Sequence, residues 1–536
     1  MLKGNKSNYS EINQVNWDVI VVGSGFGGSV SALRLAEKGY KVLVIEKGKR
    51  YRSENFPKTN WNFRKYFWMP RIFFYGIQCI TLLKNVFIFH GCGVGGGSLV
   101  YANTLMVPPD DAFEDQNWPG TNWKERLKPF YKQAKTMLGA VPAKYEAESD
   151  KILKECADYM GRGSKYHKVD VGIYFGKEGE TVEDPYFDGK GPKRTGCILC
   201  GGCMVGCRYN AKNTLDKNYL YLAEQLGVSI MPEQEVLDIN PLEDSGYQLT
   251  IRKSTGISRP IRKLQAEKVI LSGGVLGTVK LLMKCRNKGS LDNISPKLGD
   301  LVRTNSEAII GIKLKKTPKE DFSKGVAISS GFHPDKETHI ETVRYGKGQN
   351  AMALLTTFLP DRNIPLPGLL RWGISVIRSP LKFLGNIFPF DWARKTIILL
   401  VMQPVDNYLK LNYKSRWWRL GGFSMNSQTS DGKKIPSHIP IAEKTADSII
   451  KKRKGTVMTT YMDAIFDIPS TAHILGGACL GKDASSGVID ENFEMFNYLG
   501  LYVIDGSMVP SNLGVNPSLT ITALAEYAMS RFPDNN

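Results

Sequence analysis

The stretch DVIVVGSGFGGSVSALRLAEKGYKVLVIE, residues 18–46, decides the fold. Its apolar run at 19–22 is typical of a strand buried in a parallel sheet. Gly23, Gly25 and Gly28 follow with the spacing G-x-G-x-x-G. In this motif the first glycine lets the chain turn, the second admits a pyrophosphate to the backbone, and the third lets a helix pack closely on the strand. We expect that helix over 27–38, with its N-terminal amides facing phosphate.

A second strand, KVLVIE, ends on Glu46, where an acidic side chain accepts hydrogen bonds from a ribose diol. Strand, helix, strand and acid in this order predict dinucleotide binding. No further helix and strand follow promptly, as they would in a compact NAD domain. Instead a second glycine loop, GCGVGGGSLV, occupies 91–100 and favours FAD, whose isoalloxazine must lie against bare backbone far from the adenine. The positions of this loop expected at the cofactor are Gly93, Gly95, Gly96, Gly97 and Ser98.

The composition limits the classes of partner. The chain has 536 residues, of which 42% are apolar and 23% charged, as in a globular protein. Its net charge of +19 is spread along the chain without a nucleic-acid motif, so we expect no nucleic-acid partner. The polar N-terminus lacks a secretory pattern, and no apolar run is long enough to span a bilayer. A cytoplasmic protein is expected, with peripheral membrane contact as an alternative.

Several segments resemble the glucose–methanol–choline (GMC) flavoprotein oxidoreductases, in their cholesterol-oxidase-like branch. GCGVGGGSLV is similar to the loop that lies along the flavin in this family, although Tyr101 stands where the family has Asn or His. KVILSGGVLGTVKLL, residues 268–282, is similar to a second signature that turns at Gly273. EQEVLDI, residues 233–239, resembles the strand whose backbone, near Val236, touches the adenine. The resemblance covers nearly the whole chain and implies FAD as cofactor.

The C-terminal region gives the most specific resemblance, through HILGG, LYVIDGS and GVNPSLTITALAE. It implies that His473 and Asn516 are the catalytic pair. Residues bordering the flavin would be Asp505, Gly506, Asn516 and Pro517. The chemistry fits alcohol oxidation, because an imidazole can accept the hydroxyl proton while hydride passes to flavin N5, and an amide can hold the same oxygen. A second base has two candidate positions and stays unassigned. One is the segment around Asn350, where the family has Glu, and the other is Glu341.

The expected fold class is α/β, with a Rossmann-like FAD-binding domain assembled from 16–50, 210–315 and 470–536. The segments 51–209 and 316–469 would form a substrate domain, a mixed or antiparallel sheet covered by helices. Two of its stretches, 61–90 and 366–401, combine apolar and basic residues. Such segments either rest on an anionic bilayer and admit a lipophilic molecule, or pack as core helices with a basic edge. We predict a sterol or similarly lipophilic alcohol as substrate.

GCILCGGCMVGC, residues 196–207, lies within this substrate domain and holds Cys197, Cys200, Cys203 and Cys207. The spacing matches bacterial iron–sulfur ligands, although Arg208 follows where two-cluster ferredoxins have proline. A thiol-rich turn or disulfide and a zinc site are the alternatives, the last with an unusually short loop between its pairs. A cluster would pass electrons to a carrier protein, and the enzyme would be a dehydrogenase of this or another alcohol or a sugar. Further alternatives are a redox-neutral lyase or decarboxylase and a non-catalytic FAD-binding electron-transfer subunit.

Overall fold

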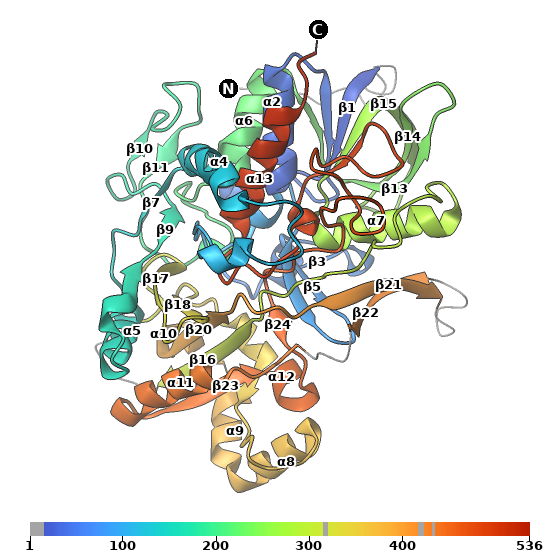
Figure 1. Cartoon of the computed structure of the whole chain (residues 1–536). Coiled ribbons are helices and arrows are strands. Elements are labelled where there is room, and N and C mark those ends of the chain that lie inside the picture. Colours follow the sequence, from blue (N-terminus) through green and yellow to red (C-terminus); the bar gives the residue numbers. More distant parts are fainter. Residues whose placement is uncertain (1–15, 315–319, 388, 416–422, 431–434, 536) are drawn as a thin grey trace.

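A computed structural model describes residues 16–314, 320–387, 389–415, 423–430 and 435–535 (Figure 1). The N-terminal residues 1–15, from which the absence of a secretory signal was inferred, lie outside these ranges. Two seven-stranded sheets organise the chain. Helices pack against both, and the α/β class expected from the sequence is confirmed.

The first sheet has the order β12-β2-β1-β15-β14-β13, with β25 also paired to β15. β12, β2, β1, β15 and β25 run parallel, whereas β14 and β13 are antiparallel. The bounds are β1 (Trp17–Val22), β2 (Val42–Ile45), β12 (Ser229–Met231), β13 (Gln234–Pro241), β14 (Tyr247–Lys253), β15 (Ile261–Leu271) and β25 (Leu501–Val503). Strands from the start, middle and end of the chain thus share one sheet.

Helix α2 (Phe26–Glu37) connects β1 to β2, close to the helix expected over 27–38. It packs against α6 (Tyr219–Gln225) and α13 (Ser518–Arg531), and α13 packs in turn on α4 (Trp123–Met137). Figure 1 shows these four helices side by side next to the parallel strands. Helix α4 comes from the segment assigned to the substrate domain, so that segment contributes to the packing here. α7 (Gly274–Lys288) packs against β13.

Two glycines of the first turn are required because other backbone atoms lie too close for a side chain. Gly23 has a φ of +107°, and a Cβ there would lie 2.2 Å from the carbonyl oxygen of Ser272. A Cβ on Gly28 would lie 2.1 Å from the carbonyl oxygen of Gly23. No side chain fits at either position. The predicted roles of these two glycines in turning the chain and packing the helix agree with this geometry.

The second sheet is antiparallel throughout, with the order β19-β23-β16-β20-β18-β17-β8. Its strands are β8 (Tyr166–Lys168), β16 (Ala308–Leu314), β17 (Ile328–Phe332), β18 (His339–Val343), β19 (Thr356–Phe358), β20 (Thr396–Met402) and β23 (Gly455–Thr460). α5 (Glu148–Tyr159) and α11 (Pro440–Lys452) cover one face and form a separate apolar core with it. Ile309 and Leu400 face the opposite side, where the cavity described below lies.

Smaller elements complete the fold. Below the second sheet in Figure 1, α8 (Gly368–Arg378) and α9 (Pro380–Ile387) project from the body, beside α12 (Tyr461–Phe466). The remaining elements are α3 (Phe63–Tyr66), α10 (Trp392–Lys395), β3 (Trp68–Met69), β4 (Phe74–Tyr75), β5 (Gln78–Leu82), β6 (Phe87–Gly91), β7 (Ala140–Pro142), β9 (Asp170–Gly172), β10 (Thr181–Val182), β11 (Arg194–Thr195), β21 (Leu409–Ser415), β22 (Phe423–Thr429) and β24 (Ser470–Thr471). Within the described ranges, none of the helices has the length and apolar character needed to cross a bilayer.

Candidate active site

A cavity of about 580 Å³ is lined by residues of both sheets. One part of its wall comes from the turn after β1, the start of α7 and the strand β13. The other part comes from the second sheet, the pair β5–β6 and the segment 472–474. The sequence-predicted residues that the structure brings to this wall are Gly23, Gly25, Glu46, Gly96, Gly97, Val236, Gly273, His473, Asp505, Gly506, Asn516 and Pro517.

The glycine loops form a bare backbone surface at one end of the cavity. Gly25 precedes α2, has no side-chain cap, and a Cβ there would meet only one atom, at 4.0 Å. A Cβ on Gly96 would lie 2.6 Å from the Cα of Gly25, so the two glycine loops touch. An uncapped helix N-terminus beside open backbone suits a pyrophosphate. These residues fit FAD, and Gly25, Gly96 and the first turn of α2 would hold its phosphates.

Glu46 is 5% exposed and reaches the cavity from the end of β2. Its carboxylate accepts hydrogen bonds from the Ser24 hydroxyl at 2.8 Å and from the Gly48 amide at 2.8 Å. These bonds fix the carboxylate at the end of the strand. Its predicted contact with a ribose diol stays a prediction.

Four predicted cofactor residues do not line the cavity. Gly28 packs against Gly23, as described above. The amide of Gly93 points at Glu46, at 3.4 Å, and the amide of Gly95 donates to the Ser24 hydroxyl at 3.1 Å. Ser98 is fully buried and donates to the Gly95 carbonyl at 2.6 Å. These residues hold the shape of the two loops from behind the cavity wall.

His473 lies on the cavity wall with 14% of its side chain exposed. Its Nδ1 is hydrogen-bonded to Oε1 of Glu307, a carboxylate with no exposed surface. The other carboxylate oxygen of Glu307 accepts the amide of Ala472 at 2.8 Å. Burial acts to lower the pKa of His473, but the carboxylates of Glu307 and Glu341 outweigh it and raise this pKa above its ordinary value. With Nδ1 engaged, Nε2 is the ring nitrogen left for chemistry in the cavity.

Asn516 stands beside Pro517 on the same wall. Its Nδ2 donates to Oε2 of Glu341 at 3.2 Å, while its buried Oδ1 has no protein partner. Burial raises the pKa of Glu341 to about 7, although the hydrogen bond from Asn516 and the charge of His473 act to lower it. An unpartnered buried amide oxygen indicates a group that a bound molecule completes.

Glu307 was not predicted from the sequence, and the second base was left open between Glu341 and the segment around Asn350. Glu307 directly precedes β16. A single acidic residue before a buried apolar strand forms no recognisable motif, so the sequence did not indicate its role. Asn350 does not line the cavity, because it lies at the start of a short 3-10 helix and accepts the amide of Ala393 at 2.9 Å. Glu341, the alternative, is the residue that contacts Asn516.

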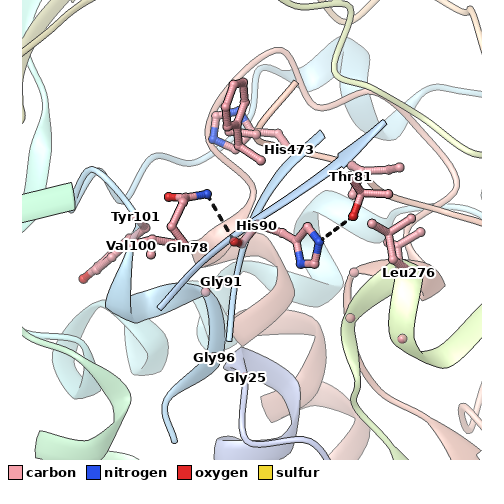
Figure 2. Close-up of a pocket in the computed structure, with 18 of the residues that line it drawn as sticks. Gly25, Gln78, Thr81, His90, Gly91, Gly96, Val100, Tyr101, Leu276 and His473 are labelled. Carbon is pink, nitrogen blue, oxygen red and sulfur yellow. Dashed lines mark hydrogen bonds between the residues drawn. The ribbon is translucent and has the colours of Figure 1, made fainter. Parts of the chain in front are cut away.

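Figure 2 shows His473 above the strand pair β5–β6, with Gly25 and Gly96 on the far side of the pair. Gln78 donates to the carbonyl of His90 at 3.2 Å, and Thr81 is hydrogen-bonded to the His90 ring at 3.0 Å. These strands thus supply a polar strip of the cavity wall. Tyr101, at the end of the second glycine loop, donates through its hydroxyl to the carbonyl of Asn213 at 2.8 Å and closes this side.

The four cysteines of 196–207 belong to a segment next to this site, and Met204 of that segment lines the cavity. Lys212 donates to the carbonyl of Leu99 at 3.1 Å and to that of Cys203 at 2.8 Å, which ties the segment to the second glycine loop. All nine cysteines are described and none is paired, so the disulfide alternative is wrong. Among the described residues, one group of three side chains has ligand atoms close enough together to hold a metal ion, and none of the three is a cysteine.

Comparison with known proteins places this geometry in a family. The profile of the family described as GMC oxidoreductase matches residues 433–525, and that of an FAD binding domain matches residues 18–59. The chain is 45% identical over 531 residues to a cholesterol oxidase of Mycobacterium tuberculosis, covering 97% of this chain and 91% of that protein. It is 42% identical to a cholesterol oxidase of Acinetobacter baumannii, covering 97% and 95%.

More distant similarity reaches a long-chain-alcohol oxidase of Arabidopsis thaliana, 25% identical over 96% of this chain and 68% of that one. The crystal structure of pyridoxine 4-oxidase from Mesorbium loti shares the fold, with a TM-score of 0.61, 14% identity and coverage of 96% and 99%. The match to the cholesterol oxidases extends over nearly the full length of both chains. The chain therefore belongs to the GMC oxidoreductase family and is an FAD-dependent alcohol oxidoreductase.

Proposed function

We propose that this enzyme oxidises the ring hydroxyl of a sterol, or the hydroxyl of a similarly lipophilic alcohol, to the carbonyl. Two relatives of nearly the same length are named cholesterol oxidases, at 45% and 42% identity. The cavity wall opposite the glycine loops supports an apolar substrate, because its side chains are mainly aliphatic or aromatic. They include Met204, Ile309, Val343, Met352, Leu355, Trp392, Ile398 and Leu400.

The pair of His473 and the buried Glu307 carries the proposal. When bound, FAD accepts the hydride that leaves the alcohol carbon. His473 Nε2 accepts the hydroxyl proton, because the Glu307 carboxylate holds Nδ1 and stabilises the imidazolium that results. The raised pKa of His473 makes it a stronger base than free imidazole, provided that the pH is high enough to keep it neutral before the reaction.

Asn516 positions the reacting oxygen in this scheme. Its Nδ2 donates one hydrogen to Glu341, and the second Nδ2 hydrogen can bond to the substrate oxygen, whose own hydrogen goes to His473 Nε2. Holding the oxygen in line with His473 removes rotational freedom from the reacting group before the proton moves. Glu341, which has no exposed surface, keeps the amide in this orientation and does not itself line the cavity.

Anaerobic flavin bleaching tests the role of His473. The wild type should bleach on mixing with cholesterol, and His473→Ala should bind FAD normally but bleach at least about 100-fold more slowly, the lower range for losing a general base. His438→Ala is the matched control, since His438 pairs with Glu443 at 2.7 Å outside the cavity. Equal bleaching rates in wild type and His473→Ala would contradict the assignment.

Peripheral contact with a membrane is a second part of the proposal. Ile377 of α8 is 80% exposed, Leu381 of α9 is 83% exposed, and Phe390, three residues after α9, is 77% exposed. The exposed cations Arg378 and Lys382 lie among these apolar side chains. α9 packs on β19, whose Thr356 lines the cavity, so the exposed tip stands near the substrate end. An apolar tip with basic residues suits an anionic bilayer that contains the lipophilic substrate.

Vesicle sedimentation tests this contact. Wild type should sediment with phosphatidylglycerol–phosphatidylcholine vesicles, and Ile377→Asp/Leu381→Asp should remain in the supernatant while retaining flavin reduction by a detergent-dispersed sterol. Burying each of these side chains is worth about 1.5–3 kcal/mol, so the double change removes most of the apolar contribution. Lys177→Asp, which alters an exposed charge outside the tip, is the control. Sedimentation of the double variant at the wild-type level would contradict the proposal.

Ligation of an iron–sulfur cluster by Cys197, Cys200, Cys203 and Cys207, with electron transfer from it to a carrier protein, stays a prediction separate from sterol oxidation. An iron and acid-labile sulfide assay on anaerobically purified protein tests it. Stoichiometric iron and sulfide would support a dehydrogenase, and their absence would support a thiol-rich turn beside an oxygen-using flavin.

A further inference from the structure

Three of the six histidines of the chain meet at one edge of the second sheet. His167 lies in β8, His333 directly follows β17, and His339 begins β18. One ring nitrogen from each lies within 4.8 Å of the other two. The ring centroids are 4.7 to 5.5 Å apart, with the His167 ring stacked on the other two. Such clustering on separate strands is not needed to build the sheet.

The strand register makes room for the three rings. Gly331 in β17 is opposite His167 of β8 and Glu341 of β18. Because alternate residues of a strand share a face, His333 and His339 lie on the same face as this glycine position. A Cβ on Gly331 would lie 2.5 Å from Nε2 of His339. The missing side chain leaves the space that the His339 imidazole occupies.

Two backbone carbonyls orient the rings for ligation. Nδ1 of His167 is 3.0 Å from the carbonyl oxygen of Lys165, and Nδ1 of His333 is 3.1 Å from that of Thr338. A carbonyl only accepts, so in both rings Nδ1 carries the hydrogen and Nε2 presents its lone pair. An Nδ1 hydrogen held by a carbonyl is the usual outer contact of a metal-bound histidine.

The separation of two nitrogens matches a metal site. Nε2 of His167 and Nε2 of His339 are 3.3 Å apart. Zn–N bonds of about 2.0–2.1 Å in a tetrahedron place two ligand nitrogens about 3.3–3.4 Å apart. His167 and His333 are half-buried whereas His339 is 1% exposed, so solvent reaches one side of the group. That side can supply a water as fourth ligand.

The inner side of the cluster faces a second unpartnered pair of atoms. Nδ1 of His339 and Oε1 of Glu341 are both buried without a hydrogen-bond partner, and they lie 3.9 Å apart. Binding of a metal at Nε2 would fix the hydrogen of His339 on Nδ1, directed at this carboxylate. Carboxylate–histidine–metal arrangements of this kind hold both the ring and the carboxylate.

We propose that His167, His333 and His339 bind a divalent transition metal of the zinc class, with water in the fourth position. The ion links β8, the end of β17 and the start of β18 through its three histidine ligands. Through His339 it also holds Glu341, which contacts Asn516 in the cavity. This last consequence rests on the proposed function, whereas metal binding itself does not.

Zinc titration of the untagged, FAD-loaded protein tests the site after treatment with a chelator. Isothermal titration calorimetry and metal analysis should find one equivalent of Zn²⁺ in the wild type. His167→Ala should bind at least about 100-fold more weakly, since even outer contacts of a ligand are worth 10- to 100-fold. His438→Ala should bind as the wild type does, because His438 lies outside the cluster. Flavin content and the thermal unfolding midpoint verify that each variant is folded.

Cobalt substitution distinguishes binding at these histidines from binding at the cysteine thiols of 196–207. Co²⁺ bound by nitrogen and water should give the visible bands of a tetrahedral ion without thiolate-to-cobalt charge transfer, and these bands should disappear in His167→Ala and in His333→Ala. His333→Ala provides a second test if His167→Ala does not fold. Absence of stoichiometric zinc binding by wild type, or equal binding by wild type and a folded histidine variant, would overturn the proposal.

Discussion

The Glu307→Gln variant gives the most informative perturbation of the proposed reaction. The Glu307 carboxylate has no exposed surface. Its Oε2 accepts a hydrogen bond from the Ala472 amide, and its Oε1 is hydrogen-bonded to His473 Nδ1. Glutamine has nearly the same shape, but only one of its terminal atoms accepts. Its oxygen must face the Ala472 amide, so its NH₂ group faces His473. Nδ1 then has to accept, and the ring hydrogen moves to Nε2.

This change of tautomer removes the base from the cavity. We expect the rate of anaerobic flavin reduction at saturating substrate to fall about 10²- to 10⁴-fold, the range for losing a general base, which corresponds to about 2.7–5.4 kcal/mol in activation free energy. Stopped-flow absorbance of the flavin measures this rate without interference from the later reoxidation step. Glu224→Gln, at an exposed pair with Arg50, is the matched control and should reduce at the wild-type rate.

The pH dependence provides a second readout with a defined sign. In wild type the rate should fall as the pH drops through the raised pKa of His473, because imidazolium cannot accept the proton. In Glu307→Gln the carboxylate that chiefly raises the pKa of His473 is gone, while burial still lowers this pKa. The fall in rate on the acid side should therefore occur at lower pH. Flavin reduction within threefold of the wild-type rate, with an unmoved acid limb, would refute the reasoning.

Three further predictions concern the cofactor and the amide in the cavity. Gly25→Val should reduce FAD occupancy of the purified protein at least tenfold, because its side chain would enter the open backbone surface; spectra of the purified protein measure this, and wild-type occupancy would contradict it. Asn516→Leu should retain FAD but slow flavin reduction by about 10²-fold, since the oxygen is no longer held in line; an unchanged rate in stopped-flow would contradict it. Glu341→Ala should slow the same step less than Asn516→Leu does, because Glu341 acts through the amide; a larger loss than for Asn516→Leu would contradict it.

The nucleotide end of the site was largely predictable because it depends on local chemistry. The turn at Gly23, the packing of Gly28 and the helix that follows depend on residues close together in sequence, and the strand–helix–strand pattern records them directly. The Rossmann-like sheet and FAD as cofactor followed from this pattern together with the family resemblance. The positions of Gly93 and Gly95 behind the cavity wall were not predictable. The sequence shows where the backbone lacks side chains, but not which of these glycines face the cavity.

The catalytic end depends on contacts between distant segments, which one sequence does not record. Glu307 and His473 meet because residues before β16 and after β24 come together. The histidine cluster arises likewise from the register of β8, β17 and β18, which no local pattern specifies. The sequence suggested Asn350 only through the family resemblance, whereas in the fold its side chain accepts the backbone amide of Ala393.

Anaerobic titration of the wild-type flavin with cholesterol tests the central claim most directly. The oxidised absorption bands should bleach completely with one equivalent of cholesterol per flavin, and mass spectrometry should identify one equivalent of the corresponding ketone. A polar sugar alcohol at the same concentration should leave the bands unchanged. A flavin that stays oxidised with cholesterol but bleaches with the sugar alcohol, or only with dithionite, would contradict oxidation of a lipophilic sterol by this enzyme.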